Sequence, residues 1–222
     1  MNILESVIEN SDIKIINLGS SCIYPLNASN PIKEESIMSG KLEATNSPYA
    51  MAKLTAIEMG DAMSKQYGHK ILNLMPTNLY GPNDHFNSHD SHVIPGLIYR
   101  MEKAKVNKET TFPIWGTGSP KREFLFVDDL SKAIIHLINN GIDTGLYNIG
   151  SGSEVSILEL VNSLTQIIGY DGELVFDKNF PDGNPRKLID STKIISTGWR
   201  PEVDLNSGLQ LTYDWFLKNI NL

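Results

Sequence analysis

Short apolar runs alternate along the chain with longer segments in which apolar residues recur every three or four positions. The runs at residues 13–18, 71–75, 124–127 and 147–149 have the length and composition of strands. The spacing in the longer segments predicts amphipathic helices, at residues 1–10, 48–67, 95–105, 128–138, 157–168 and 206–217. Strands that alternate with helices favour an α/β fold, with a parallel sheet covered by helices on both faces.

The helix at residues 48–67 has clear signals at its ends. Ser47 can cap its N-terminus, Pro48 suits the first helical position, and Gly68 is expected to end it. Its predicted buried stripe consists of apolar residues at helical intervals: Ala52, Ala56, Met59, Ala62 and Met63. Residues 23–46 and 76–82 contain prolines, glycines and asparagines without a period, and are predicted to be loops.

Two later helices carry similar signals. The helix near 128–138 is expected to begin at Asp128 or Asp129 and to bury Leu130, Ile134, Leu137 and Ile138. Ser156 and Glu159 form a capping box that opens the helix at 157–168. Residues 170–200 are predicted to be mostly loop.

Polar residues follow two of the predicted strands directly. Ser20, Ser21 and Cys22 come after the strand at 13–18, and the segment 76–80 comes after the strand at 71–75. In open parallel sheets, ligands bind beyond the carboxyl ends of the strands. We therefore expect these two segments to border one cleft.

Tyr49 and Lys53 are the strongest candidates for chemistry. They are four residues apart, so both lie on one face of the predicted helix. An ammonium group beside a phenol lowers its pKa from about 10, which suits a proton donor to a carbonyl. On a helix surface the same pair is also consistent with a solvated face. Ser20, at the end of a strand, favours catalysis because its hydroxyl can polarise the same carbonyl.

Composition and charge limit the possible partners. The chain has 222 residues, 41% of them hydrophobic and 20% charged, which is typical of a globular protein with one domain or a domain and a smaller lobe. The net charge of −7 argues against general binding to nucleic acid or anionic membranes. No apolar run is long enough to span a bilayer. The single cysteine, Cys22, excludes an internal disulfide and favours the cytoplasm.

Two further motifs have competing interpretations. His85, His89 and His92 could form a metal site with Asp84 or Asp90, but their spacing matches no common zinc pattern, and we predict no metal. The segment 150–153 superficially resembles a phosphate-binding loop. It lacks the G-x-G-x-x-G spacing and is better interpreted as a turn.

Several motifs together resemble the GDP-L-fucose synthase family, a branch of the extended short-chain dehydrogenase/reductases. The matching segments are 19–25, 48–53, 76–82, 91–95, 115–118, 122–125 and 181–187. The resemblance implies a Rossmann-like doubly wound parallel sheet with a smaller C-terminal lobe. Residues 1–81 and 123–149 would form the remainder of an NADP-binding domain, and residues 82–122 and 150–222 the lobe that binds the sugar nucleotide.

The resemblance also implies an activity. The family converts GDP-4-keto-6-deoxy-D-mannose to GDP-L-fucose by 3,5-epimerisation and NADPH-dependent 4-reduction. In this sequence Tyr49 would protonate the C4 oxygen, Lys53 would lower its pKa, and Ser20 would orient the carbonyl. Cys22 and His92 would move the protons during epimerisation. From the residues alone, Cys22 is equally consistent with an inert core cysteine.

Two sets of binding residues follow from the same resemblance. NADP(H) would be contacted by Leu18, Gly19, Ser20, Ser21, Tyr49, Lys53, Pro76, Thr77, Asn78, Leu79 and His92. The GDP-sugar would be contacted by Arg100, Trp115, Arg122, Asp182 and Lys187, since guanidinium groups bind diphosphates well. Each basic residue on its own, Arg186 included, is also consistent with an ordinary surface charge.

The 222 residues contain no Gly-rich dinucleotide-binding turn. We therefore expect about 90 residues of the family's N-terminal βαβ units to be missing before Met1, and the chain alone to be inactive or impaired. The alternatives are a non-catalytic remnant that binds a GDP-sugar, and another NAD(P)-dependent sugar-nucleotide epimerase or dehydratase. A homodimer is expected, through the helices at 1–9 and 49–67.

Overall fold

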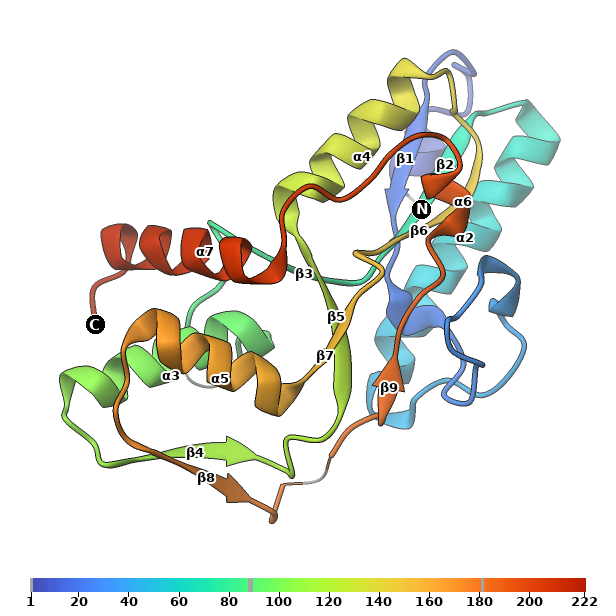
Figure 1. Cartoon of the computed structure of the whole chain (residues 1–222). Coiled ribbons are helices and arrows are strands. Elements are labelled where there is room, and N and C mark those ends of the chain that lie inside the picture. Colours follow the sequence, from blue (N-terminus) through green and yellow to red (C-terminus); the bar gives the residue numbers. More distant parts are fainter. Residues whose placement is uncertain (1, 88–89, 181) are drawn as a thin grey trace. The chain divides into compact units, whose positions relative to one another are not determined.

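A computed structural model describes residues 2–87, 90–180 and 182–222 (Figure 1). The chain divides into two compact units. The first unit comprises Met1–Thr77, Leu130–Gly152 and Leu188–Arg200, and the second comprises Asn78–Asp129, Ser153–Lys187 and Pro201–Leu222. Compared with the predicted domain bounds, residues 78–81 and 123–129 fall in the second unit, and residues 150–152 and 188–200 fall in the first.

The first unit contains a parallel sheet in the order β1-β2-β6. Its strands are β1 (Ile15–Leu18), β2 (Ile71–Pro76) and β6 (Gly145–Ile149), with Ile15 opposite Ile71 and Leu72 opposite Gly145. Every residue of the central strand β2 is buried. In Figure 1 these strands lie between α2 (Ser47–Tyr67) and α4 (Val127–Asn139), as the pattern of alternating strands and helices predicts. The remaining helices of the unit are short: α1 (Asn2–Ser6), η1 (Ser21–Ile23), η2 (Glu34–Ser36), η3 (Ala44–Asn46) and α6 (Thr192–Ile195).

The prediction that residues 13–18 form a buried strand is partly wrong. The strand begins at Ile15, its first three residues are half-buried, and Leu18 is 44% exposed. The cause is its position, because β1 pairs only with β2 within the described residues and is therefore an edge strand. An edge strand has neighbours on one side and buries less of each side chain.

The predicted buried face of α2 is partly wrong, although Met63 is buried as predicted and Ala56 and Met59 are half-buried. The buried positions are Ala50, Leu54, Ile57, Gly60 and Met63, whereas Ala52 and Ala62 are exposed. Helix α2 packs against β2 at Gly60, where an added Cβ would lie 3.3 Å from Ile71. Close contact at a glycine sets the rotation of the helix, which alanine periodicity alone does not reveal. The prediction that Ser47 caps this helix is wrong, because Ser47 is its first residue and Asn46 is the cap residue, without a side-chain capping hydrogen bond. The helix ends at Tyr67, and Gly68 is its C-cap with a φ of 76°, as predicted.

Among its described residues, the second unit has two sheets and three long helices. A four-stranded sheet contains β3 (Asn78–Tyr80), β5 (Lys121–Phe126), β7 (Glu154–Ser156) and β9 (Arg186–Lys187), and β4 (Thr111–Trp115) pairs with β8 (Glu173–Asp177). The helices are α3 (Val93–Val106), α5 (Ile157–Ile168) and α7 (Leu205–Asn219). The predicted loop at 76–82 therefore contains a strand, and β4, β7, β8 and β9 were not predicted.

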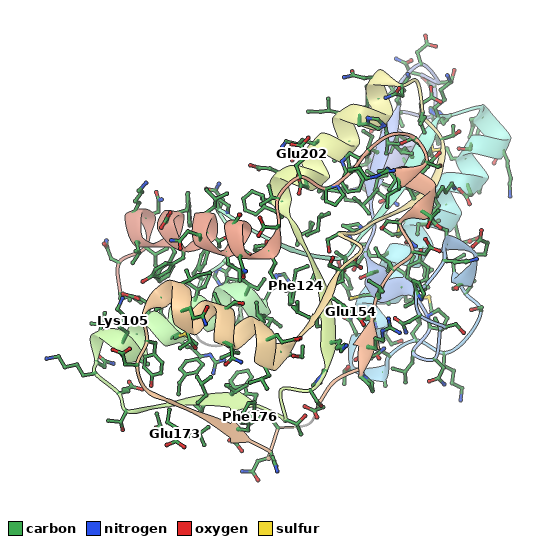
Figure 2. The ribbon with its side chains drawn as sticks, viewed as in Figure 1. Lys105, Phe124, Glu154, Glu173, Phe176 and Glu202 are labelled. Atoms are coloured by element: carbon green, nitrogen blue, oxygen red, sulfur yellow. The ribbon has the colours of Figure 1, made fainter. Side chains whose placement is uncertain are left out.

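The core of the second unit is rich in aromatic residues. Phe124 of β5, labelled in Figure 2, is buried with Phe112 and Phe216, and Phe176 of β8 packs against the same cluster. The capping box at the start of α5 is present, with the Ser156 hydroxyl accepting the Glu159 N–H at 3.1 Å.

Helix α4 begins at Val127, one residue before the predicted start. Leu130 and Leu137 are buried as predicted, but Ile134 is only half-buried and Ile138 is 47% exposed. The pattern of four apolar residues was therefore wider than the face that α4 buries.

Candidate functional site

The end of β1 positions Ser20 and Cys22. Ser20 has an extended backbone and caps η1, because its hydroxyl oxygen accepts the N–H of Cys22 at 3.2 Å. The thiol of Cys22 is free and half-buried. A short helix that begins directly after the strand thus holds both side chains at the carboxyl end of the sheet, where a ligand is expected.

Helix α2 brings Tyr49 and Lys53 to the same strand end. The Lys53 ammonium donates a hydrogen bond to the carbonyl oxygen of Leu18 at 2.7 Å and lies 5.7 Å from the centre of the Tyr49 ring. The side chain of Tyr49 is 47% exposed. No hydrogen bond links Tyr49 to Ser20 among the residues that the structure describes, and their joint action on a carbonyl stays a prediction.

A buried polar network fastens the segment after Cys22. The hydroxyl of Tyr24 donates to the side-chain oxygen of Asn148 at 2.6 Å, and the Asn148 amide donates to the carbonyl oxygens of Ile32 and Asp190. Burial, with a smaller contribution from nearby Glu34, raises the pKa of Tyr24 above its ordinary value. Sequence reasoning missed this network, because Tyr24 and Asn148 are 124 positions apart.

The second predicted strand end crosses the division between the units. Pro76 ends β2, and Thr77 is buried with its N–H donating to Ile149. Asn78 and Leu79 begin β3, and the side-chain amide of Asn78 donates to the carbonyl oxygen of Glu123 at 2.8 Å. Their predicted contact with a nicotinamide stays a prediction.

The second unit contains a cavity of about 230 Å³. Arg100, Trp115, Arg122 and Asp182, four of the five side chains predicted to contact a GDP-sugar, line it. His92 lies at the same cavity as the cap residue of α3, and its side chain makes no capping hydrogen bond. The resemblance thus selected residues that the fold gathers around one space, although they come from four separate segments.

Arg100 is held by aromatic rings. Its guanidinium carbon lies 4.6 Å from the centre of the Trp115 ring and 5.3 Å from that of Phe112. Burial lowers the pKa of Arg100 below its ordinary value, but an arginine remains charged at neutral pH. Phe180 also stacks on Trp115, at 4.9 Å between ring centres. A cation that is partly desolvated in this way interacts strongly with an anionic ligand.

Arg122 and Asp182 hold a loop at the cavity wall. The Arg122 guanidinium donates to the carbonyl oxygens of Lys121 and Asn184, at 2.8 and 2.6 Å. The Asp182 carboxylate accepts the backbone N–H of Thr117 at 2.9 Å and the Thr117 hydroxyl at 2.6 Å. These hydrogen bonds, chiefly the one from the hydroxyl, hold the pKa of Asp182 below its usual value.

The two residues of β9 behave differently from the cavity arginines. Arg186 forms an ion pair with Glu154 at 2.8 Å, which supports the surface-charge interpretation of that residue. Figure 2 labels Glu154 on β7. Lys187 is 9% exposed and lies opposite Arg122 in the sheet, but it is not among the described residues that line the cavity.

Two motifs had competing interpretations, the three histidines and the segment 150–153. His89 lies outside the described residues, and within the described ranges no group of three or more His, Cys, Asp or Glu residues is placed to hold a metal ion. Residues 150–153 lie in an irregular segment between β6 and β7. In the described part of the chain, no helix is long and apolar enough to cross a membrane.

Comparisons with known proteins agree with this architecture. Residues 1–150 match the NAD dependent epimerase/dehydratase family. GDP-L-fucose synthase 1 of Arabidopsis thaliana is 48% identical over 219 residues, which are 99% of this chain and 68% of that protein. GDP-L-fucose synthase of Escherichia coli (strain K12) is 42% identical over 98% of this chain and 71% of its own length. The crystal structure of a GDP-L-fucose synthetase from Naegleria fowleri bound to NADP is 27% identical, with a TM-score of 0.87 over 98% of this chain and 70% of that one.

The sheet of the first unit and these matches define the class: the chain belongs to the NAD-dependent epimerase/dehydratase family of α/β enzymes. Within that class its relatives at 42–48% identity are GDP-L-fucose synthases, and it is a member of that group.

Proposed function

We propose that the chain provides the catalytic and sugar-nucleotide-binding residues of a GDP-L-fucose synthase, which converts GDP-4-keto-6-deoxy-D-mannose to GDP-L-fucose with NADPH, and that the chain alone is inactive or impaired in the reduction. The observation that carries this proposal is the hydrogen bond from Lys53 to the carbonyl oxygen of Leu18, which holds Lys53, four residues after Tyr49 on α2, at the end of β1. The relatives named GDP-L-fucose synthase support the choice of substrate.

Epimerisation is assigned to Cys22 and His92. The hydrogen beside a ketone is acidic, and a thiolate is a suitable base when its pKa is near neutral. Cys22 removes that proton, and the electron pair of the broken C–H bond moves onto the ketone oxygen. Inversion requires a proton to return to that carbon on its other side, and the resemblance assigns this donation to His92. The step occurs at C3 and at C5.

Reduction is assigned to Tyr49, Lys53 and Ser20. Ser20 hydrogen-bonds the C4 oxygen, Tyr49 donates its phenolic proton to that oxygen, and the Lys53 ammonium stabilises the phenolate that remains. The residues fit the nicotinamide end of NADP(H): an ammonium has three donors, and Lys53 uses one on Leu18. When bound, this cofactor supplies the hydride that C4 receives.

Two alternatives have sequence support. A protein that only binds a GDP-sugar would keep the cavity of the second unit without any exchange of substrate protons. Another sugar-nucleotide epimerase or dehydratase would share Tyr49 and Lys53 but would not need Cys22 together with His92.

The proposed assembly is a homodimer in the cytoplasm. Helices α1 and α2 present apolar side chains to solvent, with Ile3 75% and Met51 54% exposed. Apolar side chains that face solvent favour association with a second copy when they form part of one patch. Sedimentation velocity is expected to give a dimer, and a monomer at micromolar concentration would contradict this part of the proposal.

Proton exchange tests epimerisation without the cofactor. In deuterium oxide the chain is expected to incorporate deuterium into GDP-4-keto-6-deoxymannose in the absence of NADPH. Cys22→Ser should slow incorporation by about 10²-fold or more, because the base is lost, while GDP-mannose binding is unchanged. Incorporation by the Cys22→Ser variant at the wild-type rate would contradict the assignment, and binding with no exchange by the wild type would favour the non-catalytic alternative.

The NADPH-dependent reduction at C4 is not expected to proceed with the 222-residue polypeptide alone. Its sequence contains no Gly-rich turn to hold the cofactor diphosphate. NADPH oxidation with GDP-4-keto-6-deoxymannose, followed by absorbance at 340 nm, should therefore be indistinguishable from the blank. Robust turnover would show that the diphosphate is bound without that motif.

A further inference from the structure

Thr117 is a residue of the second unit to which neither the resemblance nor the mechanism assigns a role. It lies in the turn between β4 and β5, next to Gly116 and Gly118, and that turn forms part of the cavity wall. Both oxygens of the Asp182 carboxylate are engaged by Thr117, one by its backbone N–H at 2.9 Å and the other by its hydroxyl at 2.6 Å.

Gly116, next to Thr117, leaves room for the Asp182 carboxylate. Gly116 has a φ of 78°, and a Cβ added there would lie 2.3 Å from an oxygen of Asp182. The turn can therefore approach the carboxylate closely because position 116 has no side chain. The close approach and the two hydrogen bonds are separate observations, and both place Asp182 against this turn.

The same loop has a second attachment. The Arg122 guanidinium donates to the carbonyl oxygen of Asn184, and an added Cβ at Gly183 would lie 3.1 Å from that guanidinium. Asp182 and Gly183 line the cavity with Arg122. The position of this wall therefore depends on Thr117 at one end of the loop and on Arg122 at the other.

We propose that Thr117 is a positioning residue for the sugar-nucleotide cavity, which acts by fixing the carboxylate of Asp182 and with it the loop at 182–184. This inference rests on the proposed function for its choice of ligand, a GDP-sugar. Thr117 itself is not among the described residues that line the cavity, so its effect on a ligand is exerted through Asp182.

A ligand-free measurement tests the hydrogen bonds. In wild-type protein, carboxyl NMR should give Asp182 a pKa below its ordinary value of about 3.9. Thr117→Val removes the hydroxyl donor and should raise the pKa of Asp182, whereas Thr117→Ser should restore the wild-type value. Arg122, the charged group that faces Asp182, is present in all three proteins. An Asp182 pKa that is the same in wild type and Thr117→Val overturns the proposal.

Isothermal titration with GDP-mannose tests the consequence for binding. Thr117→Val is expected to bind about three- to tenfold more weakly, the range for loss of one charge-assisted hydrogen bond at an exposed site. Thr117→Ser should bind within twofold of wild type, and so should Thr111→Val, a matched control at an exposed threonine of β4. Thermal unfolding checks that the variants fold.

The outcomes separate this inference from the proposed function. If wild type and Thr117→Val bind GDP-mannose with equal affinity, the inference is overturned and the proposed function stands. No binding by the wild type counts against the proposed function, and the titration of Asp182 then decides alone whether Thr117 fixes that carboxylate. In a double-mutant cycle, Thr117→Val should add little to the loss caused by Asp182→Ala, since the two residues act as one unit. Full additivity would overturn the proposal.

Discussion

The two candidate sites differ in how completely their side chains are held. At the end of β1, Tyr49 is half-exposed and Lys53 has one hydrogen-bond partner among the described residues. At the cavity of the second unit, Arg122 donates to the carbonyl oxygens of Lys121 and Asn184, Asp182 accepts two hydrogen bonds from Thr117, and Arg100 lies over two rings. Groups that transfer protons need spare hydrogen-bonding capacity, whereas groups that bind a ligand gain affinity from being fixed beforehand.

The largest effect that this comparison predicts is on binding. Arg100→Ala should weaken GDP-mannose binding by about 100-fold, because removing a buried charge that pairs with an anionic ligand typically costs 2–5 kcal/mol. Lys53→Ala should leave the affinity unchanged if binding depends on the second unit alone. Isothermal titration measures both. Equal losses in the two variants would contradict the separation of roles.

A smaller effect is expected on stability in the first unit. Tyr24→Phe leaves the buried oxygen of Asn148 without its donor, which should cost about 1–3 kcal/mol in the free energy of unfolding. Denaturant unfolding measures this loss. A change below 0.5 kcal/mol would mean that the network does not hold the segment after Cys22.

The same variant has a pH signature. Burial raises the pKa of Tyr24 in the folded state above the unfolded value of about 10. The stability that a raised pKa contributes is present below pH 10 and is lost as the pH rises above it. The pKa values of Tyr80 and Tyr213 are raised as well. The contribution of Tyr24 is therefore measured as the difference in unfolding free energy between wild type and Tyr24→Phe. This difference in unfolding free energy should become smaller as the pH rises above 10.

The smallest effect is expected at the surface. Arg186→Ala breaks the ion pair with Glu154, and both side chains are partly solvated. Exposed pairs contribute about 0–1 kcal/mol, so the melting temperature should change by only a few degrees and GDP-mannose binding should not change. A large loss of affinity would mean that Arg186 belongs with the binding arginines.

Local signals in the sequence predicted much of the fold. The capping box placed the start of α5, Gly68 placed the end of α2, and the apolar run at 71–75 placed β2. The rotation of α2 could not be predicted in this way, because the contact of Gly60 with Ile71 determines it. The strand β4 alternates between exposed and buried residues, but its sequence TFPIW does not alternate between polar and apolar types, so a period of two was not visible.

The candidate site was predictable to a different extent. The resemblance selected Arg100, Trp115, Arg122 and Asp182, which line one cavity, although their contact with a GDP-sugar remains a prediction. It did not reveal Thr117, because its hydrogen bonds to Asp182 join positions 65 apart in the sequence. Such pairs form only when the chain has folded, and no local pattern marks them.

The absence of a side chain at Gly116 has a consequence for how this protein can vary. Any larger residue there would collide with the Asp182 carboxylate and would also strain a backbone whose φ is positive. Positions 116 and 182 should therefore change together over evolutionary time, and a library that randomises both should recover side chains at 116 only where the acid at 182 has been exchanged for something smaller.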